Sequence, residues 1–354
     1  MHANSFYYNV SMEYSRHHTN ITKGIAVMLL LYHHIVYLDV NYAILTHISK
    51  SCVYIFVFLS SYGLTLSNIS RSSPKRTIKW ISNHIWKLEC FFFPHFIICI
   101  LLSLIFYRDD FFSTYSSVKT FIFDLLGITN ILGGRPLVRA WWYMGLALSL
   151  TLIVPIIALL YKKFGPFSII PALAIQIMTP NFNYKEYALV ITLGAISAHL
   201  NILSKITGYI NNSLTKKTVL FLILICITTI VPLGIVYLYI PLLPETLSFY
   251  LDSIVKTLIA IVFVIISICI SMSERISRVL GFLGYLSDDM FLIHIEILAV
   301  FPMLNTAIGL YAVNFTILLI ASILITLIYK ASKNRTRYNE FTERIYSAID
   351  YNIF

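Results

Sequence analysis

Apolar runs of about 20 residues, separated by short polar stretches, recur along most of the chain. A run of this length suits a helix that crosses the hydrocarbon core of a bilayer. An additional run, at residues 121–132, is shorter and contains Asp124, so we expect it to lie on the membrane or re-enter it. The pattern predicts an all-α polytopic membrane protein of about ten transmembrane helices, at about residues 22–39, 51–67, 90–107, 141–161, 167–180, 187–203, 218–240, 251–272, 281–304 and 308–329.

The composition excludes the water-soluble classes of protein. Of 354 residues, 58% are hydrophobic and 12% charged, whereas a soluble domain has roughly 25% charged and 45–50% apolar residues. The net charge of +10 therefore does not indicate a nucleic-acid partner, because basic cytoplasmic loops account for it in a membrane protein. The five cysteines form no C-x-x-C pair, so we expect them to be packing residues, with no metal site and no disulfide framework.

The basic residues set the predicted orientation, because Lys and Arg concentrate in the cytoplasmic loops of membrane proteins. Ten spans with a cytoplasmic N-terminus place most of the 26 Lys and Arg inside. Eleven spans would put the basic end of the chain outside. We therefore expect both termini to be cytoplasmic, with a cytoplasmic segment 1–21, a membrane domain 22–330 that includes a long external loop 108–140, and a basic cytoplasmic tail 331–354.

Ionisable side chains inside predicted spans are the first candidates for chemistry, because they are costly there and usually face a cavity or a pathway. In the first span, Lys23 and His34 are eleven residues apart, which puts them within about 20° of the same helix face and roughly 16 Å apart along the axis. His34 can act as a general base toward a hydroxyl, and Lys23 can hold an anionic cofactor at the cytoplasmic mouth. Alternatively, His34 hydrogen-bonds a neighbouring helix and Lys23 is an interfacial anchor. We expect His33, which points about 100° away, and the isolated His95 to be structural.

The ninth predicted span carries a second group of polar residues. Ser287 and His294 are seven residues apart and share a helix face. Ser287 has the features of a helix N-cap, followed by Asp288 and Asp289 in the first turn, where the helix dipole favours acids. His294 lies about 10 Å further along the helix, and we expect the still deeper Glu296 to be paired or protonated.

Two clusters near span ends have both a topological and a functional interpretation. Five basic residues in the predicted inside loop 71–87 agree with the positive-inside rule, but they also suit lipid headgroups or a phosphorylated cofactor. Arg139, Trp142 and Tyr143 open the fourth span at the outer surface. They form either an aromatic belt at the interface or a platform for a sugar.

Several short elements, in order over residues 18–330, resemble the membrane-bound acyltransferase family 3, whose members O-acylate surface carbohydrates. Lys23-Gly24-Ile25-Ala26, followed by His34, resembles the opening motif of that family. The segment 56–64, Phe-Val-Phe-Leu-Ser-Ser-Tyr-Gly-Leu, is similar to the family's F-F-x-x-S-G-[FY], with Ser61 where glycine is usual.

Three later elements continue the resemblance. His84-Ile85-Trp86-Lys87 occupies the place of the family's R-x-x-R element, with histidine and lysine instead of the arginines. Trp142-Tyr143-Met144 resembles a W-[FY]-[LI] span start. The segment from Ser287 to His294 is similar to the late S-[YF]-x-[IL]-Y-L-x-H motif, with Asp288 and Phe291 substituted.

The resemblance implies transfer of an acetyl or other acyl group from cytoplasmic acyl-CoA to a hydroxyl of a surface, exported or lipid-linked glycan, by a stand-alone membrane enzyme. The bacterial inner membrane is the implied location, and membrane lipids are the implied surroundings. It assigns catalytic roles to His34, His294 and Ser287, cofactor binding to Lys23, His84 and Lys87, and acceptor binding to Arg139, Trp142 and Tyr143.

Two other classes of function also fit the residues. A secondary transporter or a flippase of a lipid-linked sugar would have about ten spans and intramembrane histidines and acids. Such proteins often contain inverted repeats, and the sequence contains no repeat that we detect. A non-enzymatic scaffold for glycan assembly fits less well, because it does not need buried histidines.

Overall fold

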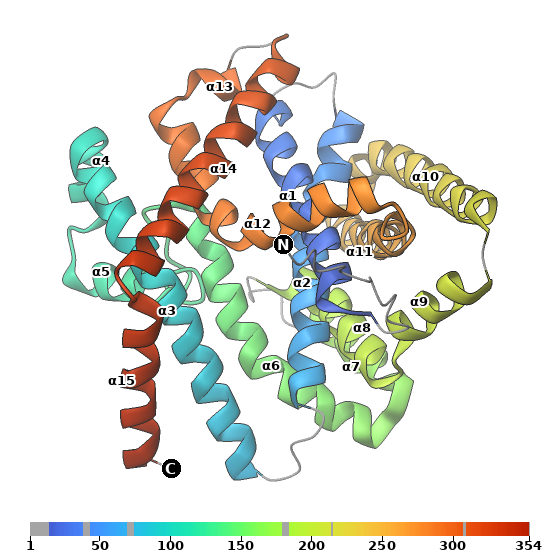
Figure 1. The fold of residues 1–354 in the computed structure, drawn as a ribbon, viewed down its shortest axis with the longest axis horizontal. Coiled ribbons are helices and arrows are strands. Elements are labelled where there is room, and N and C mark those ends of the chain that lie inside the picture. Colours follow the sequence, from blue (N-terminus) through green and yellow to red (C-terminus); the bar gives the residue numbers. More distant parts are fainter. Residues whose placement is uncertain are drawn as a thin grey trace, which may run out of the picture.

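The computed structural model describes residues 14–37, 43–68, 74–178, 184–213, 215–306 and 309–353, and within these ranges every regular element is a helix (Figure 1). The predicted all-α class is therefore confirmed. The longer helices are α1 (Arg16–Val36), α2 (Ala43–Asn68), α3 (Pro74–Phe106), α6 (Trp142–Phe164), α10 (Lys216–Tyr239), α11 (Glu245–Ile270), α12 (Glu274–Val300), α14 (Tyr311–Arg335) and α15 (Tyr338–Ile353). The shorter elements are α4 (Arg108–Thr114), α5 (Val118–Leu125), η2 (Arg139–Trp141), η3 (Gly165–Ser168), α7 (Ile169–Met178), η4 (Lys185–Tyr187), α8 (Ala188–His199), α9 (Ile202–Ser213), η5 (Ile240–Leu242) and α13 (Met303–Thr306).

Six helices in the described ranges are long and apolar enough to cross a membrane, or seven if the bent pair α8–α9 forms one span. Their outer faces are apolar, for example at Leu220, Phe221 and Leu224 of α10, which are all exposed. These helices indicate a membrane protein. The count of ten spans is not confirmed: the described parts of the fourth and fifth predicted spans, 141–161 and 167–180, fall largely within one helical stretch, Arg139–Ile175, which counts as a single candidate span.

The first and ninth predicted spans correspond to α1 and α12, which carry too many polar groups to count among the apolar helices. These two helices pack against each other in the interior of the bundle (Figure 1). A Cβ atom on Gly24 would lie 2.1 Å from the Leu280 carbonyl oxygen, and one on Gly284 would lie 1.7 Å from that of Asn20. Only glycine permits such a close approach of two backbones. The two glycines thus bring the polar faces of α1 and α12 together inside the protein.

Two segments predicted as loops contain helices, and one predicted helix start is wrong. The inside loop 71–87 is helical from Pro74 onward, because proline is favoured in the first turn of a helix. The external loop 108–140 contains α4, α5 and η2. α12 begins at Glu274, so Ser287 lies inside the helix and is not its N-cap.

The C-terminal residues form a helix, α15, that lies beside α3 (Figure 1). The Trp86 indole N–H donates to the Thr342 carbonyl at 3.3 Å, and the Tyr338 hydroxyl donates to the Cys90 carbonyl at 3.0 Å. The segment predicted as a basic tail is therefore packed against the helix that carries the other cluster of basic residues.

Candidate functional site

A cavity of about 630 Å³ brings together residues from α1, α2, η2, α6, η4, α11 and α12. His34 and His294, predicted from separate spans, both line it, as do Arg139 and Trp142. We call this space the His cavity. It contains a candidate base beside two of the three candidate acceptor-binding residues.

The two histidine rings are adjacent, with their centroids 4.9 Å apart. His294 is 1% exposed, and its Nδ1 lies 3.1 Å from the Met290 carbonyl oxygen. A neutral ring nitrogen that faces a carbonyl carries the proton, which leaves a lone pair on Nε2. That Nε2 has no hydrogen-bond partner in the described part of the chain. Because buried polar atoms are normally paired, this Nε2 is available to accept a hydrogen bond from a group bound in the cavity.

His33 also lines the His cavity, although its position on α1 predicted a structural role. Its Nδ1 lies 3.3 Å from the Ser49 hydroxyl. The cavity extends around the end of α1 toward α2, so a rotation of about 100° does not take His33 out of it.

Three charged residues of the His cavity were not predicted: Lys50, Glu186 and Lys256. Lys256 is buried, and its ammonium lies 2.5 Å from the Asp252 carboxylate. Glu186 accepts a hydrogen bond from the Tyr54 hydroxyl at 3.4 Å. Lys50 and Glu186 lie beside predicted spans, where they look like ordinary loop charges, whereas Lys256 lies inside the predicted span 251–272. The sequence contains no signal that groups the three.

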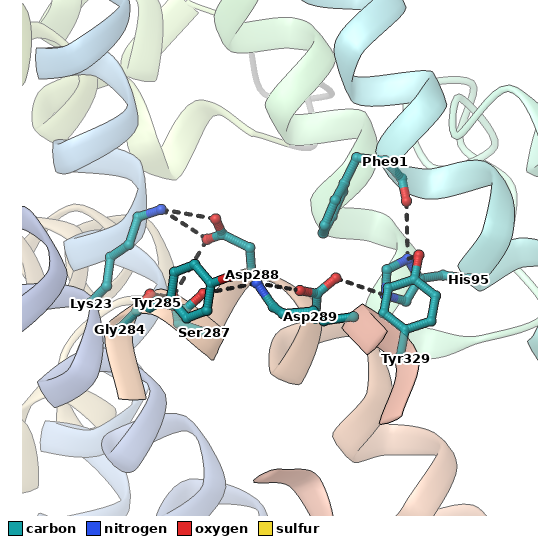
Figure 2. Close-up of polar contacts among 10 residues, drawn as sticks. Lys23, Phe91, His95, Gly284, Tyr285, Ser287, Asp288, Asp289 and Tyr329 are labelled. Atoms are coloured by element: carbon teal, nitrogen blue, oxygen red, sulfur yellow. Dashed lines mark hydrogen bonds and ion pairs between the residues drawn. The ribbon is translucent and has the colours of Figure 1, made fainter. Parts of the chain in front are cut away.

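A second cavity, of about 260 Å³, contains Lys23 and Tyr143. The Lys23 ammonium lies 2.9 and 3.0 Å from the two carboxylate oxygens of Asp288 (Figure 2). Lys23 and His34 thus both contact α12, as their shared face on α1 predicts. Phe291 lines this cavity and the His cavity, so the two are neighbours across one aromatic ring. Tyr143 is separated by that ring from the other candidate acceptor-binding residues.

A third cavity, of about 320 Å³, lies between α3 and α15 and contains Lys87 and Lys333. Phe91 lines both this cavity and the second one. His84 lies elsewhere on α3: its Nδ1 is 2.8 Å from the Trp80 carbonyl oxygen, and the two rings are 4.2 Å apart. The structure therefore does not bring the three candidate cofactor-binding residues into one space.

Ser287 is fully buried and lines none of these three cavities. Its hydroxyl donates to the Gly284 carbonyl at 2.8 Å (Figure 2). The geometry gives Ser287 a packing role within α12.

Asp289 belongs to a buried network rather than to a first helical turn (Figure 2). Its carboxylate lies 3.3 Å from His95 Nε2 and 3.1 Å from the Lys330 ammonium. The Tyr329 hydroxyl lies 3.2 Å from His95 Nδ1. The network joins α3, α12 and α14, which agrees with the structural role expected for His95.

Glu296 lies in an apolar pocket of about 320 Å³ between α3, α12 and α14. Cys99 and Tyr329 line the same pocket, and the Cys99 thiol is next to the Glu296 carboxyl. The sequence predicted that Glu296 is paired or protonated but did not identify the Cys99 thiol as its neighbour.

The segment between α3 and α6 is organised around Asp124, which is 1% exposed. Its carboxylate accepts hydrogen bonds from the Tyr115 hydroxyl at 2.8 Å and from the Leu137 backbone N–H at 2.9 Å. Burial raises the pKa of Asp124 above its ordinary value. Because Leu137 is two residues before Arg139, this contact helps to fix the end of the segment that reaches the His cavity.

No protein-family model, curated protein or solved structure matches this chain.

Proposed function

We propose that this chain is an integral-membrane O-acyltransferase that moves an acyl group, in the simplest case acetyl, from cytoplasmic acyl-CoA to a hydroxyl of a surface or exported glycan. The observation that carries this proposal is the adjacency of His34 and His294 in the His cavity. Two imidazoles beside a space of about 630 Å³ suit proton removal from a bound hydroxyl. A purely structural contact between two helices does not need a pair of imidazoles beside a cavity.

The proposed reaction is direct acyl transfer. The acceptor hydroxyl loses its proton to His34 while its oxygen forms an ester bond to the acyl carbonyl carbon. The carbon–sulfur bond of the thioester breaks, and the CoA sulfur leaves and takes up the proton. His294 Nε2, which accepts but does not donate a hydrogen bond in the tautomer set by Met290, suits a hydroxyl or N–H group rather than a carbonyl oxygen.

The three cavities support a route for the acyl donor. Lys87 and Lys333 in the cavity between α3 and α15 outnumber Glu343, which also lines it, so a net positive charge faces the CoA phosphates. Phe91 separates that cavity from the Lys23 cavity, and Phe291 separates the latter from the His cavity. A donor bound along this series would direct its acyl end toward His34. Lys23 would have to exchange Asp288 for a phosphate in order to take part.

The proposal includes ten spans, cytoplasmic termini and a bacterial inner membrane. Helices α1 and α12, with 21 and 27 residues, are long enough to cross a bilayer. The His cavity is lined by residues next to the segments that the charge distribution places outside, including Arg139 and Glu186. Lys23 and Lys87 come from segments placed inside. Donor and acceptor would thus approach from opposite sides of the membrane.

The test is an assay of the purified full chain in lipid nanodiscs with radiolabelled acetyl-CoA and a panel of neutral and acidic glycans. We expect glycan-bound label with the wild-type protein and its loss in His34→Ala, with unchanged thermal unfolding. Absence of transfer together with uptake of a lipid-linked sugar by proteoliposomes would replace the proposal with a transporter.

A further inference from the structure

The His cavity has an excess of positive charge. Among the described residues, three cations line it, Lys50, Arg139 and Lys256, and one carboxylate, Glu186, opposes them. Lys256 is neutralised by Asp252, at 2.5 Å. Within the described residues, neither Lys50 nor Arg139 forms an ion pair, and both are exposed.

Unpaired cations beside a ligand cavity favour a negatively charged ligand. Among the described residues, no carboxylate lies within ion-pair distance of either cation, so each can form a charge-assisted hydrogen bond with an anionic group of a ligand. Glu186, which the Tyr54 hydroxyl contacts, reduces this preference but does not reverse it, because Lys50 and Arg139 together carry two positive charges.

An aromatic wall extends the site beyond the His cavity. The His cavity adjoins a polar groove of about 390 Å³, and the two share three lining residues, Trp142, Glu186 and Tyr187. The rings of Trp142 and Tyr187 are nearly parallel, at 13°, with centroids 6.2 Å apart. The groove is completed by Asn130, Gly133, Gly134 and Tyr184. Sugar rings commonly bind against such flat aromatic and amide surfaces, so the groove has room for a neighbouring unit of the acceptor.

We propose that the acceptor is an anionic glycan, with a carboxylate or phosphate held by Lys50 and Arg139 while its hydroxyl faces the histidine pair. The inference rests on the proposed function, because it takes the His cavity as the acceptor site. It assigns the specificity of that site to two residues outside the catalytic pair.

The test measures equilibrium binding to the purified full chain in nanodiscs without acyl-CoA. The probes are a glucuronic acid disaccharide, its glucose counterpart, and glucose 1-phosphate against glucose. We expect at least one anionic probe to bind about tenfold or more tightly than its neutral partner, and the preference to fall as salt screens the exposed cations. The arm that shows the preference identifies the anion as a sugar carboxylate or a phosphate.

Variants give the sign of the effect. Lys50→Gln and Arg139→Gln should weaken binding of the preferred anion about tenfold, and Glu186→Gln should strengthen it. Arg135→Gln, in the same segment but outside both cavities, is the matched control and should change nothing. A merely structural role would make all three site variants bind more weakly.

Equal binding of charged and neutral probes, or weaker binding in Glu186→Gln, would overturn the inference. The proposed function is judged separately: His34-dependent acetylation of a neutral glycan would leave it standing while this inference fails.

Discussion

At the scale of single residues, His34 is the side chain on which the account depends most. We expect His34→Asn to lower the rate of acyl transfer by about 10²–10⁴, the usual contribution of a general base. His294→Asn should also lower it, because the free Nε2 disappears. His199, which stacks on Tyr161 away from the cavity, is the matched control, and His199→Asn should keep most activity in the same radiolabel assay.

Transfer at the wild-type rate in His34→Asn would remove this residue from catalysis. If His294→Asn alone abolished transfer, the base would be His294, since its unpartnered nitrogen already has the required lone pair.

Asp288 and Asp289 are neighbours in the sequence and should respond differently to substitution. Asp289 is buried between His95 and Lys330, and removing one partner of a buried ion pair costs about 3–5 kcal/mol. Asp288 is 54% exposed in its pair with Lys23, and such pairs are worth about 0–1 kcal/mol. Thermal unfolding in detergent should therefore show a large loss of stability for Asp289→Ala and a small one for Asp288→Ala.

The same pair also tests the donor route. Because the Asp288 carboxylate forms an ion pair with the Lys23 ammonium, Asp288→Asn should leave that ammonium available to a phosphate. We expect acyl-CoA binding to be tighter in calorimetry. Weaker binding in Asp288→Asn would argue that Lys23 has no role with the donor.

The candidate site was predictable only in part at this scale. His34 and His294 stand out because an ionisable side chain inside an apolar run is costly and usually faces a cavity or a pathway. Lys50 and Glu186 do not stand out, because each lies beside an apolar run, where charge is ordinary. Lys256 lies inside the predicted span 251–272 and could have been noticed there. Ser287 shares a helix face with His294, but its hydroxyl donates a hydrogen bond to the Gly284 carbonyl. The sequence alone does not reveal such a local bond.

At the scale of elements, the α1–α12 contact depends on two glycines. Replacing Gly24 or Gly284 by alanine puts a methyl group into a backbone carbonyl of the facing helix, and overpacking of this kind costs about 1–3 kcal/mol. Gly63 in α2 has no atom near its would-be Cβ and is the matched control. We expect Gly24→Ala and Gly284→Ala to lower the melting temperature and Gly63→Ala to keep it or raise it slightly.

A melting temperature that is unchanged in both Gly24→Ala and Gly284→Ala would mean that α1 and α12 are not in close contact. The arrangement of the histidine pair would then need revision.

The segment that contains α4 and α5 should show a pH dependence from Asp124. Its pKa is raised in the folded protein by burial, so folding favours the protonated form. The stability gained from protonation is present in full below the ordinary pKa of about 3.9 and is lost as the pH rises through the folded pKa. We expect the hydrogen-exchange protection of the Leu137 amide, corrected for intrinsic rates, to decrease over that interval.

Asp124→Asn, which keeps an oxygen for Tyr115 and Leu137 but does not titrate, should abolish this decrease. A decrease of equal size in Asp124→Asn would assign the pH dependence to another group.

Helices were predictable from the sequence, but several of their ends were not. Ser287 looks like a helix N-cap, but α12 begins at Glu274 and Ser287 lies inside it, one turn after Gly284, which contacts α1. The basic run that begins at Lys75 looks like a loop, but it forms the first turns of α3. At 33 residues, α3 is about 50 Å long and exceeds the thickness of a bilayer core of about 30 Å.

At the scale of the whole molecule, apolar runs predict the helical membrane class but not the arrangement of the helices. The His cavity is made by residues that are far apart in the chain: His34 and His294 are on α1 and α12, and Arg139 precedes α6. Helix periodicity gives the face of each helix, whereas the choice of neighbour depends on close contacts such as that of Gly24 with Leu280. The same limit applies to α15, whose position beside α3 completes the third cavity.

In the proposed function, the chain transfers an acyl group from a donor bound near Lys87 to an acceptor bound near His34, and the two ligands enter from opposite sides of the membrane. The most direct measurement uses sealed proteoliposomes with an impermeant acidic glycan enclosed and radiolabelled acetyl-CoA added outside. We expect label on the enclosed glycan, in proportion to the fraction of protein whose termini face outward, and none with His34→Asn. Enclosed glycan that stays unlabelled, while glycan added on the same side as acetyl-CoA becomes labelled, would contradict it.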